Sequence, residues 1–379
     1  MADRSSPPAT VTLLLAGDVM TGRGIDQMLA HPGEPTLHES FVHDARDYLR
    51  LAEGMNGPIA RGAANDYVWG DALAELQRVG PRLRIVNLET AVTRGGTPWP
   101  DKGIHYRMHP ANVGCLRAAR IDACTLANNH VLDWGRAGLH ETLLSLREAG
   151  LQVAGAGASA DEAAAPARLP LPARGRLLLF GRAAPGSGVP PDWAAGPHGP
   201  GVALLPDLSA ATARQLAEDL LRHRRADDIV VLSIHWGGNW GLAVTPAHRD
   251  FAHRLIDAGA VDVVHGHSSH HPLPVELYHG KLILYGCGDL INDYEGIEAH
   301  GSLRSDVACL YFATLHAGSG RLQALDIVPL QLKRFRLGIA DAEAHNWLGQ
   351  VFGSAPAALG VQPSRQGPRG WSLRTPAGS

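Results

Sequence analysis

The sequence predicts a single layered α/β domain, in which strands and helices alternate along the chain. Three observations support this fold class. Short apolar runs rich in Val, Leu and Ile recur between longer segments with helical spacing, and glycine or proline separates them. Polar side chains follow directly after several of these runs, as they do where strands deliver residues to the carboxyl edge of a sheet. The 379 residues suffice for one large domain or two smaller ones, and no internal repeat or long linker divides them.

The composition is that of an ordinary globular protein, with 45% hydrophobic residues, 19% charged residues and a net charge of −3. This balance gives no support to a nucleic-acid groove or to a polybasic membrane patch. The four cysteines are isolated, with no CxxC pair, and they indicate buried thiols in a reducing compartment.

The two ends of the chain differ from its middle. Residues 1–10 are polar and proline-bearing, and they are predicted to be disordered. The following apolar run, Val11–Ala16, is too short for a signal peptide or a transmembrane helix. We therefore expect a cytoplasmic protein without a membrane anchor. From Gly353 onward glycine, proline, serine and arginine predominate, so residues 353–379 are predicted to be a loosely ordered tail and residues 11–352 the folded domain.

Taken in order, the expected strands are β-branched or leucine-rich runs that end at glycine or at polar clusters. They are Val11–Ala16, Leu83–Val86, Asp122–Leu126, Leu151–Gly157, Leu177–Phe180, Asp228–Ile234, Val261–Val264, Lys281–Tyr285, Val307–Leu315 and Ala324–Leu330. The expected helices have apolar residues three and four positions apart. They are Trp69–Val79, Ala111–Ala119, Leu139–Ala149, Ala210–Arg225, Pro246–Ala258 and Asp341–Phe352. Residues 31–68 are predicted to be loops and short helices, residues 160–173 a connection, and residues 185–201 a loop near a site.

The candidate functional residues lie where the predicted strands end. They comprise two carboxylates, one amide and three imidazoles. Histidines are especially frequent at the end of the segment Val261–His271. The six residues are Asp18, Glu89, Asn129, His235, His267 and His270. Because the carboxyl ends of parallel strands meet at one edge of a sheet, we expect these side chains to converge.

Each position by itself has an ordinary structural interpretation as well. Asp18 would serve as the N-cap of the following helix, and the histidine-rich segment would be a surface loop. The run Asn128-Asn129-His130 would be a polar turn. The recurrence of the same pattern at successive strand ends favours a metal centre over these separate explanations.

Mixed oxygen and imidazole ligands suit Mn²⁺ as the first expectation, with Mg²⁺, Ca²⁺, Zn²⁺ or Fe²⁺ as alternatives, and the absence of cysteine argues against a structural zinc site. Six ligands exceed what one catalytic ion needs when positions stay open for water and substrate. A two-metal site with a bridging carboxylate is therefore expected, without an organic cofactor.

The ordered motifs resemble those of the CapA family, which is named from poly-γ-glutamate capsule synthesis and belongs to the calcineurin-like metallophosphoesterase superfamily. The resemblance runs from about Leu13 to Phe352. Its motifs are Gly17-Asp18, Asn87-Leu88-Glu89-Thr90, Ala127-Asn128-Asn129-His130, His235-Trp236-Gly237 and Gly266-His267-Ser268-Ser269-His270. The resemblance implies a four-layer αββα sandwich of the metallophosphoesterase type and a dinuclear site.

The resemblance also implies roles for the matching residues. Asp18 and His270 would bind the first ion, and Glu89 would bridge the two ions. The ligands of the second ion would be Asn129, His235 and His267. His130 falls where phosphoesterases keep a general acid beside the metals.

Three departures from the superfamily pattern argue against phosphate-monoester hydrolysis. Met20 occupies a position where phosphoesterases have a histidine ligand, so the first ion is expected to be one ligand short. The second motif is Asn-Leu-Glu instead of Gly-Asp-x-x-Asp. The last motif has one extra residue between its histidines.

The segment Gly288–Gly296 resembles one subgroup of CapA-like proteins that lacks a membrane anchor and includes metal-dependent epimerases of lasso-peptide biosynthesis. This resemblance implies a divalent-metal-dependent peptide epimerase that inverts the Cα centre of a terminal residue through an enolate. Two proton carriers would act on opposite faces of the carbon. The predicted carriers are His130 and Asp289, with His271 or Asp293 as substitutes.

For the peptide substrate, the candidates to hold a terminal carboxylate are Arg23, Lys102 and Arg107. Trp134, Trp236 and Trp240 are candidates to line an apolar pocket, although core packing is the expected role of at least two of them. Two alternatives to the epimerase stay open. One is hydrolysis of a phosphoester or a γ-glutamyl amide, and the other is a CapA-type, non-enzymatic subunit of an envelope polymer complex.

Overall fold

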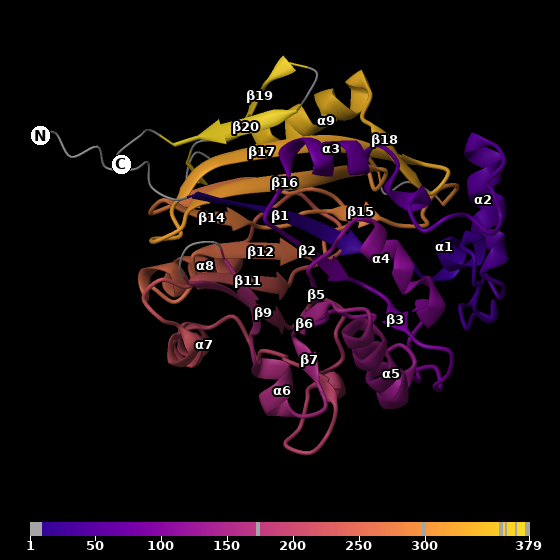
Figure 1. Ribbon diagram of the computed structural model, residues 1–379, viewed down its shortest axis with the longest axis horizontal. Helices are drawn as coiled ribbons and strands as arrows, with labels where there is room; N and C mark the ends of the chain where they lie inside the picture. Colours follow the sequence, from indigo (N-terminus) through magenta and orange to yellow (C-terminus); the bar gives the residue numbers. More distant parts are fainter. Residues whose placement is uncertain are drawn as a thin grey trace, which may run out of the picture.

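Two β-sheets pack face to face in the computed structural model, which describes residues 10–171, 175–297, 301–355, 359–360, 362–367 and 370–375 (Figure 1). Among these residues the larger sheet has ten strands, and its main path runs β19-β20-β17-β16-β1-β2-β5-β6, with β15 paired to β1 and β18 to β17. Its strands are β1 (Thr10–Val19), β2 (Leu83–Leu88), β5 (Ala123–Thr125), β6 (Gln152–Ala154), β15 (Asp289–Ile291), β16 (Val307–His316), β17 (Leu322–Lys333), β18 (Arg336–Ile339), β19 (Ser364–Arg365) and β20 (Trp371–Arg374).

The smaller sheet has the order β13-β14-β12-β11-β9-β8. Its strands are β8 (Ala167–Pro170), β9 (Arg176–Ala183), β11 (Ile229–His235), β12 (Val263–His267), β13 (Val275–Tyr278) and β14 (Lys281–Leu284). Two short pairs stand apart from both sheets: β3 (Ala91–Val92) with β4 (Arg107–Met108), and β7 (Ala156–Gly157) with β10 (Gly201–Val202).

Helices cover the outer faces of both sheets. The side chains of α1 to α5 belong to the apolar core on the outer face of the larger sheet, and those of α7 and α8 to the core on the outer face of the smaller one. The helices are α1 (Arg23–Met28), α2 (Arg46–Asn56), α3 (Ala72–Val79), α4 (Gly114–Ala118), α5 (Gly135–Glu148), α6 (Ala160–Ala164), α7 (Ala210–His223), α8 (Pro246–Asp257) and α9 (Ala342–Gly353).

Alternation along each strand divides the apolar side chains between these layers. In β1, Leu14 and Ala16 face the helices, whereas Leu13 and Leu15 face the other sheet. The same alternation in the smaller sheet directs Val230, Leu232 and Ile234 of β11 outward to α7 and α8. Three cores therefore separate four layers, and the predicted αββα sandwich is confirmed.

The parallel strands of both sheets end on the same side of the molecule. In the larger sheet β1, β2, β5 and β6 are parallel, and in the smaller one β9, β11, β12 and β14 are parallel. The arrowheads of β1, β11 and β12 point the same way in Figure 1, toward the region of α1 and β3. This shared edge is where ligands bind in open α/β sheets.

Most predicted elements are present, with bounds that differ by a few residues. β1 is longer than expected and contains Asp18, and the helix predicted for Ala111–Ala119 divides into the 3₁₀ turn Pro110–Val113 and α4. The connection predicted for residues 160–173 contains α6 and β8, and its last two residues lie outside the described part of the chain. Residues 1–9 also lie outside it. The division into domain and termini stays a prediction.

Two short strands, β19 and β20, lie within the segment that was predicted to be a loosely ordered tail from Gly353 onward. β20 pairs with β17 along Trp371–Arg374, and β19 pairs with β20. The physical reason is that Leu373 is buried and the Trp371 ring packs against Phe352 of α9. The high glycine and proline content of this segment gives no indication that a few of its side chains are buried against the domain.

Gly17 permits the close approach of β1 to the segment before β15, which places Asp18 opposite Asp289. A Cβ atom at Gly17 would lie 1.7 Å from the Gly288 carbonyl oxygen, a backbone atom that has no room to move. We expect Gly17→Ala to destabilise the protein by about 3 kcal/mol or more in urea denaturation. The matched control is Gly54→Ala, because no atom lies within 4 Å of the added Cβ in α2. That change should be neutral or stabilising by about 0.5–1 kcal/mol, and equal effects of the two substitutions would contradict the argument.

Within the described ranges, the helices are too short or too polar for any of them to cross a membrane.

Candidate metal centre

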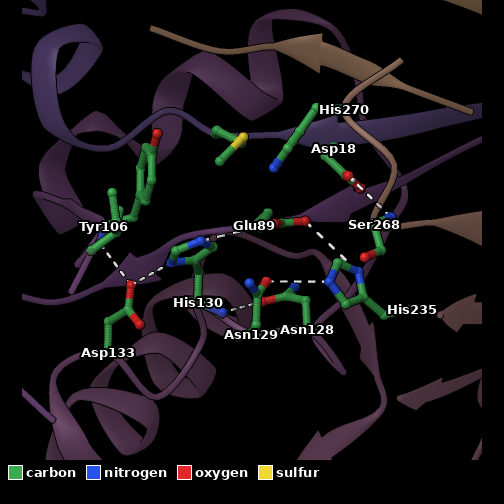
Figure 2. A network of polar contacts seen from close by, with 12 residues as sticks. Asp18, Glu89, Tyr106, Asn128, Asn129, His130, Asp133, His235, Ser268 and His270 are labelled. Atoms are coloured by element: carbon green, nitrogen blue, oxygen red, sulfur yellow. Dashed lines mark hydrogen bonds and ion pairs between the residues drawn. The ribbon is translucent and has the colours of Figure 1, made fainter. Parts of the chain in front are cut away.

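The predicted metal ligands come from both sheets and meet at the carboxyl ends of the parallel strands (Figure 2). Asp18 lies near the end of β1, and Glu89 follows directly after β2. His235 and His267 are the last residues of β11 and β12, and they stand opposite each other in the register of the two strands. His270 belongs to the loop after β12. The strand-end pattern in the sequence therefore corresponds to one cluster in space.

Two buried carboxylates face each other across an amide. The Asn87 side chain donates to Asp18 Oδ1 at 2.8 Å and is 2.9 Å from Glu89 Oε2. Burial, followed by repulsion from Asp289, raises the pKa of Asp18 to about 7. Burial, followed by repulsion from Asp18, raises the pKa of Glu89 well above its ordinary value. Two carboxyl groups held this way need positive charge nearby before both can ionise.

Two neutral imidazoles complete this side of the cluster. His235 Nδ1 lies 2.8 Å from His267 Nδ1 and 3.8 Å from Glu89 Oε2. His267 Nδ1 lies 3.9 Å from Asp18 Oδ1. Burial lowers the pKa of both imidazoles well below the ordinary value, so both rings are neutral at pH 7 and each has one nitrogen that can act as a donor to a metal. Asn129 Oδ1 contacts the other ring nitrogen of His235 at 3.2 Å. Its role as a metal ligand stays a prediction.

The donor atoms form two sets of three that share Asp18. One set is Asp18, His235 and His267, and the other is Asp18, His270 and Asp289; within each set the donor atoms lie within 4.8 Å of one another. All five side chains are buried. Carboxylate oxygens combined with neutral imidazoles are the donors that Mn²⁺, Fe²⁺ and Zn²⁺ accept. These residues therefore fit divalent metal ions, and Asp18 belongs to both sets. The number of ions and the bridging role of Glu89 stay predictions.

Asp289, which was predicted from the sequence to be a proton carrier, lies within the ligand cluster. As the first residue of β15 it lies opposite Asp18 and contacts His270 Nδ1 at 2.9 Å. Burial is the largest single influence and by itself would lower the pKa of His270, but the charge and hydrogen bond of Asp289 together with the charge of Asp18 outweigh it and raise that pKa. Asp289 thus belongs to a set of possible metal donors with Asp18 and His270, and its predicted role as a proton carrier stays a prediction. The repeated Gly-Asp at positions 17–18 and 288–289 was the available signal for its membership of this set.

His130 lies beside the ligand cluster with its Nε2 directed toward Glu89 Oε1 at 4.0 Å (Figure 2). Its Nδ1 is 2.7 Å from Asp133 Oδ2, and Lys102 Nζ is 2.7 Å from Asp133 Oδ1. Burial, followed by repulsion from Lys102, lowers the pKa of His130 to about 4, so the ring is neutral at pH 7. Because the Asp133 carboxylate accepts from Nδ1–H, the lone pair is on Nε2, which faces the metal centre.

Three residues that the sequence did not identify hold this arrangement. Asn87 joins the two carboxylates, and Asp133 orients His130. Asn128 donates to Asn87 Oδ1 at 3.0 Å and accepts from the backbone N–H of His130 at 3.1 Å. The spacing of His130 and Asp133, three residues apart in a polar loop, was a signal for their pairing, whereas the contacts of Asn87 and Asn128 depend on side-chain directions.

Arg23 and Asp293 satisfy each other in a buried ion pair. Arg23 Nε donates to Asp293 Oδ2 at 3.1 Å, and a second nitrogen of Arg23 donates to Glu39 Oε1 at 3.0 Å. The Arg23 guanidinium also lies over the rings of Tyr48 and Tyr106. The predicted roles of Arg23 in substrate binding and of Asp293 in proton transfer stay predictions. In this structure each is occupied by the other.

The remaining predicted site residues divide between core and cavity. His271 Nε2 accepts from the Gly241 N–H at 3.2 Å, and the Arg107 guanidinium donates to the Glu34 carbonyl and lies over the Trp134 ring. Trp236 is buried, stacks on His248 and donates to the Tyr285 carbonyl, which is a core-packing role. None of these groups is directed at the metal centre by a contact within the described residues.

A cavity of about 200 Å³ adjoins the cluster on the side of His270. Trp240 lines it, with its ring centre 5.2 Å from that of His270. The wall is mainly aromatic and aliphatic, and its further members include Phe41, Tyr48, Ile104, Tyr294 and Ile297. A ligand in this cavity would reach the metal centre through His270.

Comparison with known proteins gives consistent matches. Residues 12–294 match the family model described as bacterial capsule synthesis protein PGA_cap. A "probable polyglutamine synthesis accessory protein" of Mycobacterium tuberculosis is 45% identical over 356 residues, which cover 94% of this chain and 93% of the relative. The "PGA biosynthesis protein CapA" of Bacillus subtilis is 27% identical over 82% of this chain and 70% of its own length. The "capsule biosynthesis protein CapA" of Bacillus anthracis is 26% identical over 85% of this chain and 68% of its own length.

Proposed function

Since this chain belongs to the family of bacterial capsule synthesis proteins, we propose that it is a CapA-type component of glutamyl-polymer synthesis that acts as a divalent-metal-dependent amide hydrolase. The observation that carries the proposal is the pair of ligand sets that share Asp18, with His130 directed toward the adjoining Glu89 carboxylate. The relatives are named as accessory or biosynthesis proteins, so we expect this chain to act beside a polymer-forming enzyme on the same polymer.

His130 is the proton carrier of the proposed reaction. When bound, divalent ions would supply Lewis-acid polarisation of an amide carbonyl. His130 Nε2 would take a proton from the attacking water and deliver it to the leaving nitrogen. Asp133 holds the ring so that Nε2 faces the cluster, and Lys102 holds Asp133. The fixed ring orientation places the base without any rearrangement when substrate arrives.

The pairing of nearby cations favours a neutral amide over a phosphate. A phosphate group carries up to two negative charges and is normally held by free arginine or lysine side chains. Here Arg23 is paired with Asp293 and Glu39, and Lys102 with Asp133. An amide bond requires no such counter-charge and fits these neutralised surroundings better.

The epimerase hypothesis requires a second proton carrier opposite His130. The other candidates are engaged in contacts of their own: Asp289 with His270, Asp293 with Arg23, and His271 with the Gly241 N–H. The relatives reported above are named for polyglutamine synthesis or PGA biosynthesis and not for peptide epimerisation. Hydrolysis needs only the one carrier that faces the cluster, and we therefore prefer it.

The proposal is tested with α-linked and γ-linked oligomers of glutamate and of glutamine. Protein loaded with Mn²⁺ is expected to shorten at least one of them, as seen by mass spectrometry, and chelation should abolish the cleavage. Intact oligomers in all four reactions would overturn the proposal. The same reactions in D₂O report deuterium at Cα, so exchange without cleavage would favour the epimerase. Faster turnover of p-nitrophenyl phosphate than of any oligomer would favour a phosphoesterase.

His130→Gln is expected to lower kcat for oligomer cleavage by about 10²–10⁴-fold, the usual contribution of a general base. The metal content should be unchanged, because His130 belongs to neither ligand set. His140→Gln is the matched control, since this exposed histidine lies on α5 and should leave kcat unaltered. Unchanged kcat in His130→Gln would remove His130 from the mechanism, whereas lost metal would make it a ligand.

A further inference from the structure

Arg182 is a buried arginine on the outer face of the smaller sheet. In β9 it stands opposite Ile234 of β11, whose side chain lies in the core beneath α7 and α8. The side chains of the next pair in the register, Ala183 and His235, point to the opposite face of the sheet. Arg182 therefore points away from the metal centre, into the layer between the sheet and α7.

The Arg182 guanidinium has no carboxylate partner within the described ranges. Its hydrogen bonds go to two backbone carbonyls, those of Gly181 at 2.8 Å and Ala164 at 3.2 Å. The side chain is only 5% exposed. Burial lowers the pKa of Arg182 to about 10, and the attraction of Asp219 offsets this effect only in part. Buried arginines are ordinarily paired with an acid, so this one departs from the rule.

A cavity of about 320 Å³ opens beside Arg182, between α6, β10 and α7. Its wall consists mostly of small aliphatic side chains, among them Ala164, Ala194, Val202, Leu205 and Pro206. Thr212 and Gln215 of α7 add neutral polar groups at one side. This volume lies at the lower end of the range for small-molecule sites.

The charges around the cavity define what it can accept. Asp219 is the one carboxylate among the described lining residues, and it is ion-paired with Arg222 on the surface of α7. A single buried cation therefore faces the cavity, with one acid at its rim. This arrangement balances one negative charge and disfavours a dianion, which would meet Asp219 with its second charge unpaired.

We propose that this cavity is a second binding site, separate from the metal centre, for a small monocarboxylate with an aliphatic body. The carboxylate would accept from the Arg182 guanidinium, and the aliphatic part would lie against the alanine, valine, leucine and proline side chains. The proposal does not depend on the reaction catalysed at the metal centre.

The test is titration calorimetry of the full chain with hexanoate, with hexanamide as the uncharged control and inorganic phosphate as the dianionic one. We expect one hexanoate per chain in the millimolar range or tighter. Hexanamide should bind at least about tenfold more weakly, because a hydrogen bond to a charged group is worth more than one to a neutral group. Phosphate should neither bind there nor displace hexanoate. Because the metal centre is the same in every variant, differences between variants isolate the Arg182 site.

Three substitutions locate the binding. Arg182→Met should weaken hexanoate at least about tenfold, but it also removes the contact with the Ala164 carbonyl and so affects folding. Gln215→Trp, at an exposed position of α7, fills the cavity with Arg182 in place and should have the same effect. Asp219→Asn should tighten binding about two- to fivefold by removing the acid at the rim. The proposal is overturned if hexanoate does not bind, if Gln215→Trp binds it normally, or if phosphate or hexanamide binds equally well.

Discussion

His235→Ala is expected to remove one of two divalent ions and to lower oligomer cleavage by about 10³-fold or more. The substitution deletes a donor from the set that His235 forms with Asp18 and His267. Even partners outside the ligand set typically change metal affinity by about 10–100-fold, so loss of a ligand should exceed that. Lewis-acid stabilisation is worth several kcal/mol of the barrier, which corresponds to the expected loss in rate. Metal analysis of the purified protein and the oligomer assay measure the two effects.

His248→Ala provides the matched control for this substitution. Its ring stacks on Trp236, the residue after His235, with ring centres 4.8 Å apart, but it contacts no member of the ligand sets. It should keep both ions and full activity. If His235→Ala also kept both ions, the set containing His267 would not be a metal site, and the proposed hydrolysis would lose its basis.

The fold was predictable because strand and helix periods in this chain are regular and the strand ends carry a distinctive chemistry. The apolar sequence of β1 and the apolar residues before the histidines of β12 both predict buried parallel strands that end in polar residues. Parallel strands of one sheet end at a common edge, so the convergence of His235 with His267 followed from topology without any knowledge of side-chain directions. Asp18 belongs to the other sheet, and it meets them because the two sheets pack with the ends of their parallel strands on the same side. The resemblance to the CapA family supplied the number of layers.

The roles of individual polar groups were less predictable, because they depend on contacts between residues far apart in sequence. Asp289 pairs with His270 only because β15 runs beside β1, a pairing that the sequence does not announce. Arg23 pairs with Asp293, which lies 270 residues later in the chain, and nothing in the local sequence of either residue indicates this ion pair. Local periodicity describes which face a side chain occupies, but not which partner it finds there.

Asp18→Asn is expected to stabilise the metal-free protein at pH 8 and to destroy its response to metal. Burial raises the pKa of Asp18 from 3.8 to about 7. A carboxyl whose pKa is higher in the folded than in the unfolded state contributes stability that is complete below about pH 4 and is lost as the pH rises through about 7. A shift of this size corresponds to about 4 kcal/mol at most. Asparagine has no charge to bury, so the variant should escape this loss.

The hydrogen bonds of Asp18 determine how large the stability gain of Asp18→Asn should be. Asparagine can still accept from Asn87, but its NH₂ group would oppose the Ser268 N–H, which now donates to Asp18 Oδ2 at 3.3 Å. Subtracting about 1 kcal/mol for that hydrogen bond leaves a net gain of about 2–3 kcal/mol at pH 8 in chelator, measured by urea denaturation. Asp262→Asn is the matched control, because this buried carboxylate is already paired with Arg224 at 2.9 Å, and its loss should destabilise the protein with or without metal.

Addition of Mn²⁺ should reverse the order of stabilities. The wild-type chain gains from binding that is restricted to the folded state, whereas Asp18→Asn lacks the carboxylate common to both ligand sets and should gain little. At pH 5 in chelator Asp18 is protonated in the folded protein, so the advantage of the variant should shrink there. If Asp18→Asn were destabilising in chelator at pH 8, the carboxylate would be adequately solvated or paired without a cation. The physical case that these strand ends are built to hold divalent ions would then fail at its central residue.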